Sequence, residues 1–197
     1  MCLKVHKGTY VGVGEYIDEE GIQLLVLPTE VVLAGSNQPK DWLRNFDAKL
    51  VPGDMFGTGK IHRGFKRYAE KAWSYIEDLL EKRPFMSFYG HSQGGSVASL
   101  LALLYKNKYP SSSVSIITYG APAFSDEKFT TNFKKTEYTR FVHSYDVVTS
   151  LPLSSKYKHP VKVTRIGITG WKGRLNTAAF PVRTHWHSSY IKEIEKW

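Results

Sequence analysis

The residues best suited to chemistry lie in Gly-His-Ser-Gln-Gly-Gly at positions 90–95. An aromatic-rich run, Phe85 to Tyr89, precedes them and predicts a buried strand, whereas the Ala- and Leu-rich run from Gly94 to Tyr105 predicts a helix. A sharp strand-to-helix turn needs small residues on both sides of the serine, because the backbone crowds there. The turn presents the serine hydroxyl at the N-terminus of the helix, where the helix dipole favours developing negative charge. We therefore predict that Ser92 is a nucleophile.

A serine hydroxyl is too weakly acidic to attack an ester alone, so it needs an imidazole base and a carboxylate that orients the base. Asp146 follows the strand predicted at 139–143, and two histidines, His185 and His187, come late in the chain. The order Ser, Asp, His is that of α/β-hydrolases. On a strand the two histidines would share a face, so spacing alone does not separate them. Asp126 is a rival orienting group, but a carboxylate in the first turn of a predicted helix serves helix stability better.

The remaining histidines offer weaker candidates. We predict that His91 packs beside the nucleophile, that His62 is a structural hydrogen-bonding residue, and that His143 and His159 lie at the surface. The sequence holds neither a His-x-x-x-His nor a His-Glu-x-x-His pair, and its single cysteine, Cys2, forms no Cys-x-x-Cys pair. We therefore expect no metal site and no cofactor.

Length and composition favour one globular domain over residues 1–197, since the chain is 42% hydrophobic. The net charge is +9 and the pI is about 9.5. A basic surface favours transient contact with anionic partners such as a phospholipid surface, although a basic but inert surface explains the charge as well. We expect no nucleic-acid partner, because the basic residues are spread along the chain rather than gathered in one run.

Three features that the sequence lacks bear on the expected compartment. No apolar run reaches the length of a membrane span, the first residues carry no secretory pattern, and one cysteine excludes an intramolecular disulfide. An intracellular setting, cytoplasmic or possibly viral in a host cytosol, is therefore favoured over secretion.

The expected elements alternate between strands and helices. The apolar stripe of 64–83 predicts the clearest helix, which Pro84 ends. Strands are predicted at 21–28, 29–34, 85–89, 114–119, 139–143 and 161–168, and further helices at 94–105, 125–135 and 188–197. This alternation predicts an α/β fold with a central, mostly parallel sheet flanked by helices, and a site at the carboxyl ends of the strands.

Taken together, the motifs resemble those of the class 3, or fungal-type, lipases. The matching segments, in chain order, are Val-Val-Leu-Ala-Gly-Ser at 31–36, Asp-Trp to Asp at 41–47, Ile-His-Arg-Gly-Phe at 61–65, the serine motif at 90–95, Thr-Tyr-Gly-Ala-Pro at 118–122, Asp-Val-Val with Leu-Pro at 146–152 and His-Ser-Ser-Tyr at 187–190. Departures are Ala34 for the family's arginine, Gln93 for its commoner leucine and Thr149 for its proline.

The resemblance assigns further roles. It implies a compact α/β-hydrolase fold, a closing His-x-x-Tyr motif that makes His187 the base, and an oxyanion hole formed by the N–H groups of Ser36 and Gln93. It also implies that residues 37–46 form a lid over an apolar cleft.

The expected activity is hydrolysis of carboxylic esters in glycerolipids, through Ser92, Asp146, His187 and an acyl-enzyme. Two alternatives remain open at this point. One is a phospholipase that acts on anionic membrane lipids, which the net charge weakly favours. The other is a catalytically silent hydrolase fold that binds a lipid or a partner.

Overall fold

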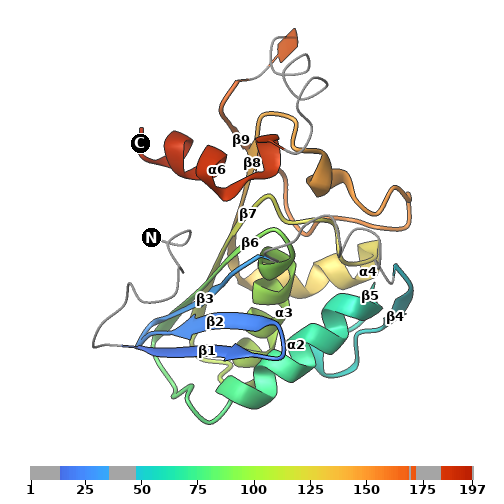
Figure 1. The fold of residues 1–197 in the computed structure, drawn as a ribbon. Helices are drawn as coiled ribbons and strands as arrows, with labels where there is room; N and C mark the ends of the chain where they lie inside the picture. The colour runs from blue at the N-terminus through green and yellow to red at the C-terminus, as the bar shows by residue number, and fades with distance from the viewer. Residues whose placement is uncertain (1–13, 36–47, 169, 172–182, 197) are drawn as a thin grey trace.

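A central sheet organises the computed structural model, which describes residues 14–35, 48–168, 170–171 and 183–196. Within these residues the main sheet has seven strands (Figure 1), in spatial order β1 (Glu15–Glu19), β2 (Ile22–Val26), β3 (Glu30–Leu33), β6 (Phe85–His91), β7 (Ser113–Tyr119), β8 (Glu137–His143) and β9 (Thr164–Ile166). The first three pair antiparallel and the rest pair parallel. The predicted mostly parallel sheet is therefore confirmed.

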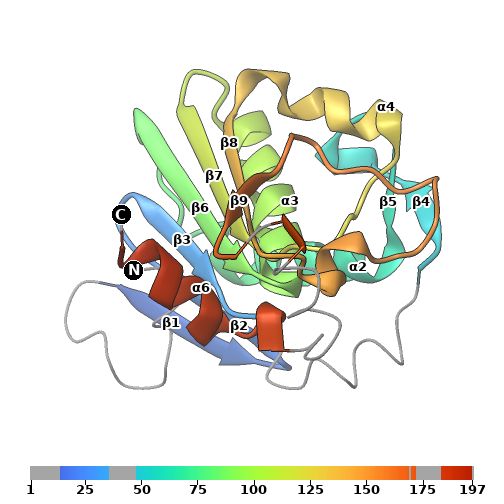
Figure 2. The ribbon, with the colours of Figure 1, turned by 90° about the horizontal axis from the view of Figure 1, so that it is seen from above.

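Helices cover both faces of this sheet (Figure 2). α2 (Arg63–Ile76) and α3 (Gln93–Lys108) lie on one face with the larger apolar core, which includes Phe88, Leu101 and Ile116. α6 (His187–Ile194) lies on the other face, above a smaller cluster. Every residue of α3 from Gly94 to Tyr105 is buried, because the helix is enclosed between the sheet and α2.

Shorter elements surround this framework. They are β4 (Leu50–Pro52), β5 (Lys60–His62), α4 (Glu127–Thr130) and the 3₁₀ helices η1 (Asp54–Phe56), η2 (Thr131–Lys135), η3 (Val147–Ser150) and η4 (Arg183–His185). Of these, η4 contains His185, and η3 directly follows Asp146. Among the described residues, no helix is long and apolar enough to cross a membrane. The predicted lid, 37–46, lies outside the described residues.

Several boundaries differ from the prediction. The helix predicted at 64–83 ends at Ile76, although Leu80 beyond it is still buried, so the apolar stripe continues through non-helical turns. The strand predicted at 161–168 is limited to β9 at the sheet edge. β1 was missed because its sequence, Glu-Tyr-Ile-Asp-Glu, is mostly exposed and carries no apolar alternation. A turn with positive φ at Glu20 and Gly21 joins it to β2.

Candidate active site

Ser92 lies at the turn between β6 and α3, in the conformation that the motif predicts. Its φ is +55° and its ψ is −131°, a strained combination for a residue other than glycine. The flanking glycines allow the turn, because a Cβ at Gly90 would lie 2.3 Å from the Gly94 carbonyl oxygen, and one at Gly94 would lie 2.4 Å from the oxygen of Ala34. The close approach of backbone to backbone, rather than flexibility, is therefore what requires glycine at these positions.

A continuous hydrogen-bonded chain joins Ser92, His185 and Asp146. The Ser92 hydroxyl lies 2.8 Å from Nε2 of His185, and Nδ1 of the same ring lies 2.7 Å from Oδ2 of Asp146. Each of the three residues exposes only 2% of its surface. With Nδ1–H donating to the carboxylate, Nε2 presents its lone pair to the serine proton. The arrangement is that of a nucleophile, a general base and an orienting group.

The prediction that His187 is the base is wrong, since its rival His185 holds that position. The two residues do not share a strand face. His185 ends η4 and His187 begins α6, and Trp186 between them is the extended N-cap of α6, so the two histidines belong to different elements. His187 is half-buried, with its ring edge-on to that of His91. The resemblance to His-x-x-Tyr therefore pointed to a histidine two residues after the one that contacts Ser92 and Asp146.

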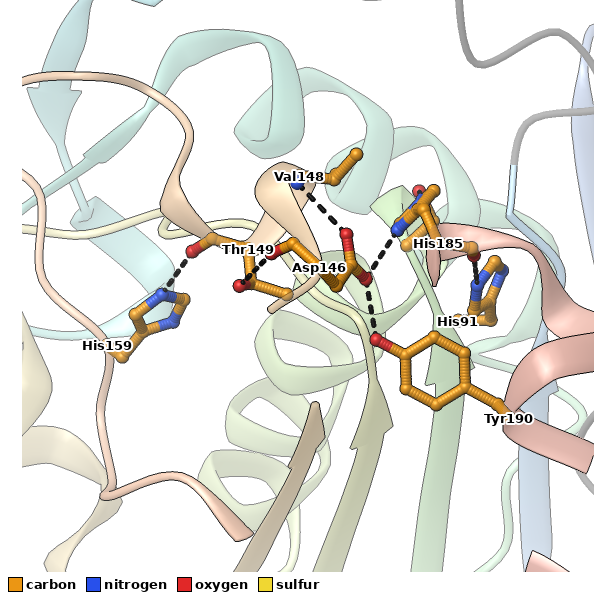
Figure 3. A network of polar contacts seen from close by, with 8 residues as sticks. His91, Asp146, Val148, Thr149, His159, His185 and Tyr190 are labelled. Atoms are coloured by element: carbon orange, nitrogen blue, oxygen red, sulfur yellow. Dashed lines mark hydrogen bonds and ion pairs between the residues drawn. The ribbon is translucent and has the colours of Figure 1, made fainter. Parts of the chain in front are cut away.

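Asp146 is held by a dense set of donors (Figure 3). Its Oδ1 accepts the Val148 N–H at 3.0 Å, which caps η3, and its Oδ2 accepts the Tyr190 hydroxyl at 2.6 Å in addition to His185. Burial and the nearby Asp146 charge raise the pKa of Tyr190 well above its ordinary value, so this hydroxyl stays a donor. Tyr190 belongs to the His-Ser-Ser-Tyr motif at 187–190, but the sequence alone indicates no role for its hydroxyl.

Gly120 makes room for this carboxylate. Its φ is +63°, and a Cβ there would lie 2.8 Å from both Oδ2 of Asp146 and the Tyr190 hydroxyl oxygen. Within the Thr-Tyr-Gly-Ala-Pro segment, Gly120 therefore matters because it has no side chain, which leaves room for Asp146 and Tyr190. A search for chemically reactive residue types does not find such a position.

His91 contacts both the backbone and the ring of His185. Its Nε2–H donates to the backbone carbonyl of His185 at 2.9 Å, and the two rings stack with centroids 5.0 Å apart. Burial, and next the neighbouring His185, lower the pKa of His91 to about 3, so the ring is neutral near pH 7. The predicted packing role is confirmed, and the hydrogen bond to the backbone of His185 is an addition.

The expected oxyanion site is described only in part. Gln93 is the first residue of α3, where backbone N–H groups lack partners within the helix. Gly35 lies beside the nucleophile, since a Cβ on it would be 3.1 Å from that of Ser92. Ser36, the other predicted donor, lies outside the described residues.

Other candidates have structural places. Asp126 caps α4 by accepting the Phe129 N–H, and His62 caps α2 by accepting that of Phe65, as predicted for both residues. His159 is not at the surface, because it lies half-buried against Arg140. The described part of the chain holds no group of three His, Cys, Asp or Glu residues that could bind a metal.

Comparison with known proteins agrees with this geometry. Residues 30–156, more than half of the chain, match the family model described as Lipase (class 3). The chain belongs to the class 3 lipase family. This confirms the resemblance that the motifs indicated.

Individual relatives match over part of their length. The chain is 30% identical over 112 residues to Toxin TseL of Vibrio cholerae, covering 56% of this chain and 18% of the toxin. It is 33% identical over 142 residues to the secreted mono- and diacylglycerol lipase 3 of Gibberella zeae, covering 64% and 43%. The chain thus spans less than half of each of these two relatives.

Solved structures agree with the fold. The native Rhizomucor miehei lipase–propeptide complex superimposes with a TM-score of 0.62 at 20% identity, covering 78% of this chain and 55% of that one. At this identity the likeness shows the α/β-hydrolase fold of fungal lipases, and it confirms the predicted fold class.

Proposed function

We propose that this protein is a serine carboxylic ester hydrolase of the lipase type that cleaves acyl esters of glycerolipids. The observation that carries the proposal is the hydrogen-bonded chain from Ser92 through His185 to Asp146, at the strand-to-helix turn of a class 3 lipase.

In the first half-reaction, Ser92 Oγ attacks the ester carbonyl while its proton passes to Nε2 of His185. Asp146 stabilises the imidazolium that forms. The tetrahedral oxyanion collapses, the C–O bond to the alcohol breaks, and Nε2–H protonates the leaving alkoxide. An acyl-enzyme remains on Ser92.

In the second half-reaction, His185 removes a proton from water, which attacks the acyl-enzyme. The fatty acid leaves and Ser92 recovers its proton. We assign stabilisation of both oxyanions to the backbone N–H groups of Gln93 and Ser36, assisted by the N-terminal end of α3.

An apolar substrate fits the surroundings of the site. Val147, next to Asp146, is 42% exposed, and Trp186, next to His185, is 53% exposed. Exposed apolar side chains beside two members of a triad suit an acyl chain or a lipid surface better than a polar ester. An intracellular setting and contact with an anionic membrane stay predictions from the sequence.

The decisive experiment measures p-nitrophenol release from short- and long-chain acyl esters. Ser92→Ala is expected to lower kcat/KM by at least about 10⁴-fold, and a fluorophosphonate probe should label the wild type at Ser92 alone. Ser111→Ala, which alters an exposed serine, is the matched control. Fatty-acid release from triglyceride emulsions, neutral liposomes and anionic liposomes then separates lipase from phospholipase. A folded wild type that is inert on every substrate and unlabelled by the probe would favour the silent, lipid-binding alternative.

A further inference from the structure

A second polar site lies on the far side of η3 from the triad. Figure 3 shows His159 and Thr149 on one side of Asp146 and His185 on the other. An open pocket of about 570 Å³ is found there, and its polar lining includes Arg140, Arg165, His159, Ser154 and Ser155. The volume lies in the range of small-molecule sites.

Arg140, at the base of this pocket, lacks the partners that a buried guanidinium requires. Its side chain is buried, with only 7% of the residue exposed, and Nε has no hydrogen-bond partner among the described residues. No carboxylate of the described residues lies within ion-pair distance of it. A buried cation is normally paired with an anion, because burial removes its hydration.

The hydrogen bond between Arg140 and His159, within the described residues, does not resolve this deficit. Nη2 lies 2.9 Å from Nε2 of His159, but the same nitrogen lies 2.7 Å from the Thr149 carbonyl oxygen. Burial, and then the Arg140 charge, lower the pKa of His159 to about 4, so its ring is neutral near pH 7. A single Nε2 either donates to Thr149 or accepts from Arg140, but not both. With the bond to Thr149 made, Arg140 faces an N–H group.

The rest of the pocket adds positive charge and hydroxyl groups. Burial lowers the pKa of Arg140 and the charge of Arg165 adds to this, whereas Tyr138, Tyr190 and Asp146 act in the opposite direction. The guanidinium of Arg165 donates to the Ser144 carbonyl and lies over the Tyr145 ring, without an ion pair among the described residues. No Asp or Glu lines the pocket. Two arginines without a carboxylate therefore face the same space.

We propose that this pocket binds a phosphate group, carried either by a free phosphomonoester or by a lipid headgroup. The guanidinium of Arg140 supplies the buried charge, Arg165 supplies the second cation at the rim, and the hydroxyls of Ser154 and Ser155 are donors to further phosphate oxygens. Arginine binds phosphate through two parallel N–H groups, which would satisfy Arg140 where His159 does not. The site is separate from the triad and does not require hydrolase activity.

The test is calorimetric titration of the whole chain with inorganic phosphate and with glycerol 3-phosphate, up to about 10 mM in phosphate-free buffer. The wild type and Ser92→Ala are expected to bind equally. Arg165→Gln should weaken binding about tenfold, as expected for loss of one charge-assisted contact, and Arg140→Gln should abolish it. Arg67→Gln removes the same charge from an exposed position on α2 and should bind like the wild type.

Sedimentation with vesicles separates the two sources of phosphate. Stronger retention of the wild type than of Arg165→Gln on phosphatidate vesicles, with no difference on phosphatidylcholine vesicles, identifies a headgroup. Binding of the soluble phosphates alone identifies a free phosphomonoester. If neither soluble phosphate binds, or if Arg165→Gln binds as tightly as Arg67→Gln, the proposal is overturned. The exposed Arg165 keeps the test valid should Arg140→Gln fail to fold.

Discussion

Two polar clusters flank η3, and they differ in how well their hydrogen bonds are satisfied. On the triad side, both oxygens of Asp146 accept bonds from Val148, Tyr190 and His185. On the other side, Arg140 keeps an unpartnered Nε and shares one nitrogen of His159 with a carbonyl. Asp146 and Arg140 are both buried, with 2% and 7% of each residue exposed, so exposure does not explain the difference.

The hydrogen bonds of Asp146 are typical of a preorganised site, whereas the unpartnered Nε of Arg140 is typical of a site that binds an anion. A fully bonded carboxylate costs no rearrangement when charge develops on the neighbouring imidazole, which suits catalysis. An underbonded buried guanidinium costs stability until an anion arrives, which suits binding. Removing a donor to Asp146 should therefore lower the free energy of unfolding, whereas removing the Arg140 charge should leave it unchanged or raise it.

The largest effect is expected within the triad side, at the two histidines. His185→Gln should lower kcat by roughly 10³-fold or more, since it removes the base. His187→Gln should change kcat by less than about threefold, because it leaves the hydrogen-bonded chain intact. Steady-state kinetics on a p-nitrophenyl ester, with circular dichroism to verify folding, measures both. The reverse ranking would restore His187 as the base.

A smaller effect should separate the two clusters in stability. Tyr190→Phe removes a donor from the satisfied carboxylate and should lower the free energy of unfolding by about 1–3 kcal/mol. Arg140→Met removes a buried charge that lacks a carboxylate and should stay within about 1 kcal/mol of the wild type, or exceed it. Urea unfolding in phosphate-free buffer compares the two. Equal losses would mean that Arg140 is as well satisfied as Asp146.

An effect absent at neutral pH and expected only on acidification is a pH dependence carried by His91. Its pKa in the folded protein, about 3, lies below the ordinary value of 6.5, so the unfolded chain takes up the proton first as pH falls. Stability that is fully present above pH 6.5 is then lost towards pH 3, by at most about 1.4 kcal/mol per pH unit from this group. Urea unfolding at several pH values should show a shallower acid slope for His91→Gln. An unchanged slope would mean that His91 is protonated in the folded protein.

The elements that local pattern specifies were predicted well. The turn at Ser92 follows from glycines and flanking apolar runs, and the parallel sheet follows from alternating strands and helices. The sequence does not predict β1, because a mostly exposed polar strand shows no alternation of apolar and polar residues and is held only by pairing with β2. It predicts α2 too long, because an apolar stripe does not mark where helical backbone ends.

The sequence by itself predicted the family, and it singled out Ser92 and Asp146, which the structure joins through one histidine. Only the tertiary structure showed that His185, rather than His187, contacts Ser92 and Asp146. The difference depends on the change of backbone direction between η4 and α6, which the spacing of the two histidines does not predict. The same holds for Tyr190, Gly120 and the Arg140 pocket. Their roles arise from contacts between segments far apart in the chain, and such contacts exist only once the sheet has brought those segments together.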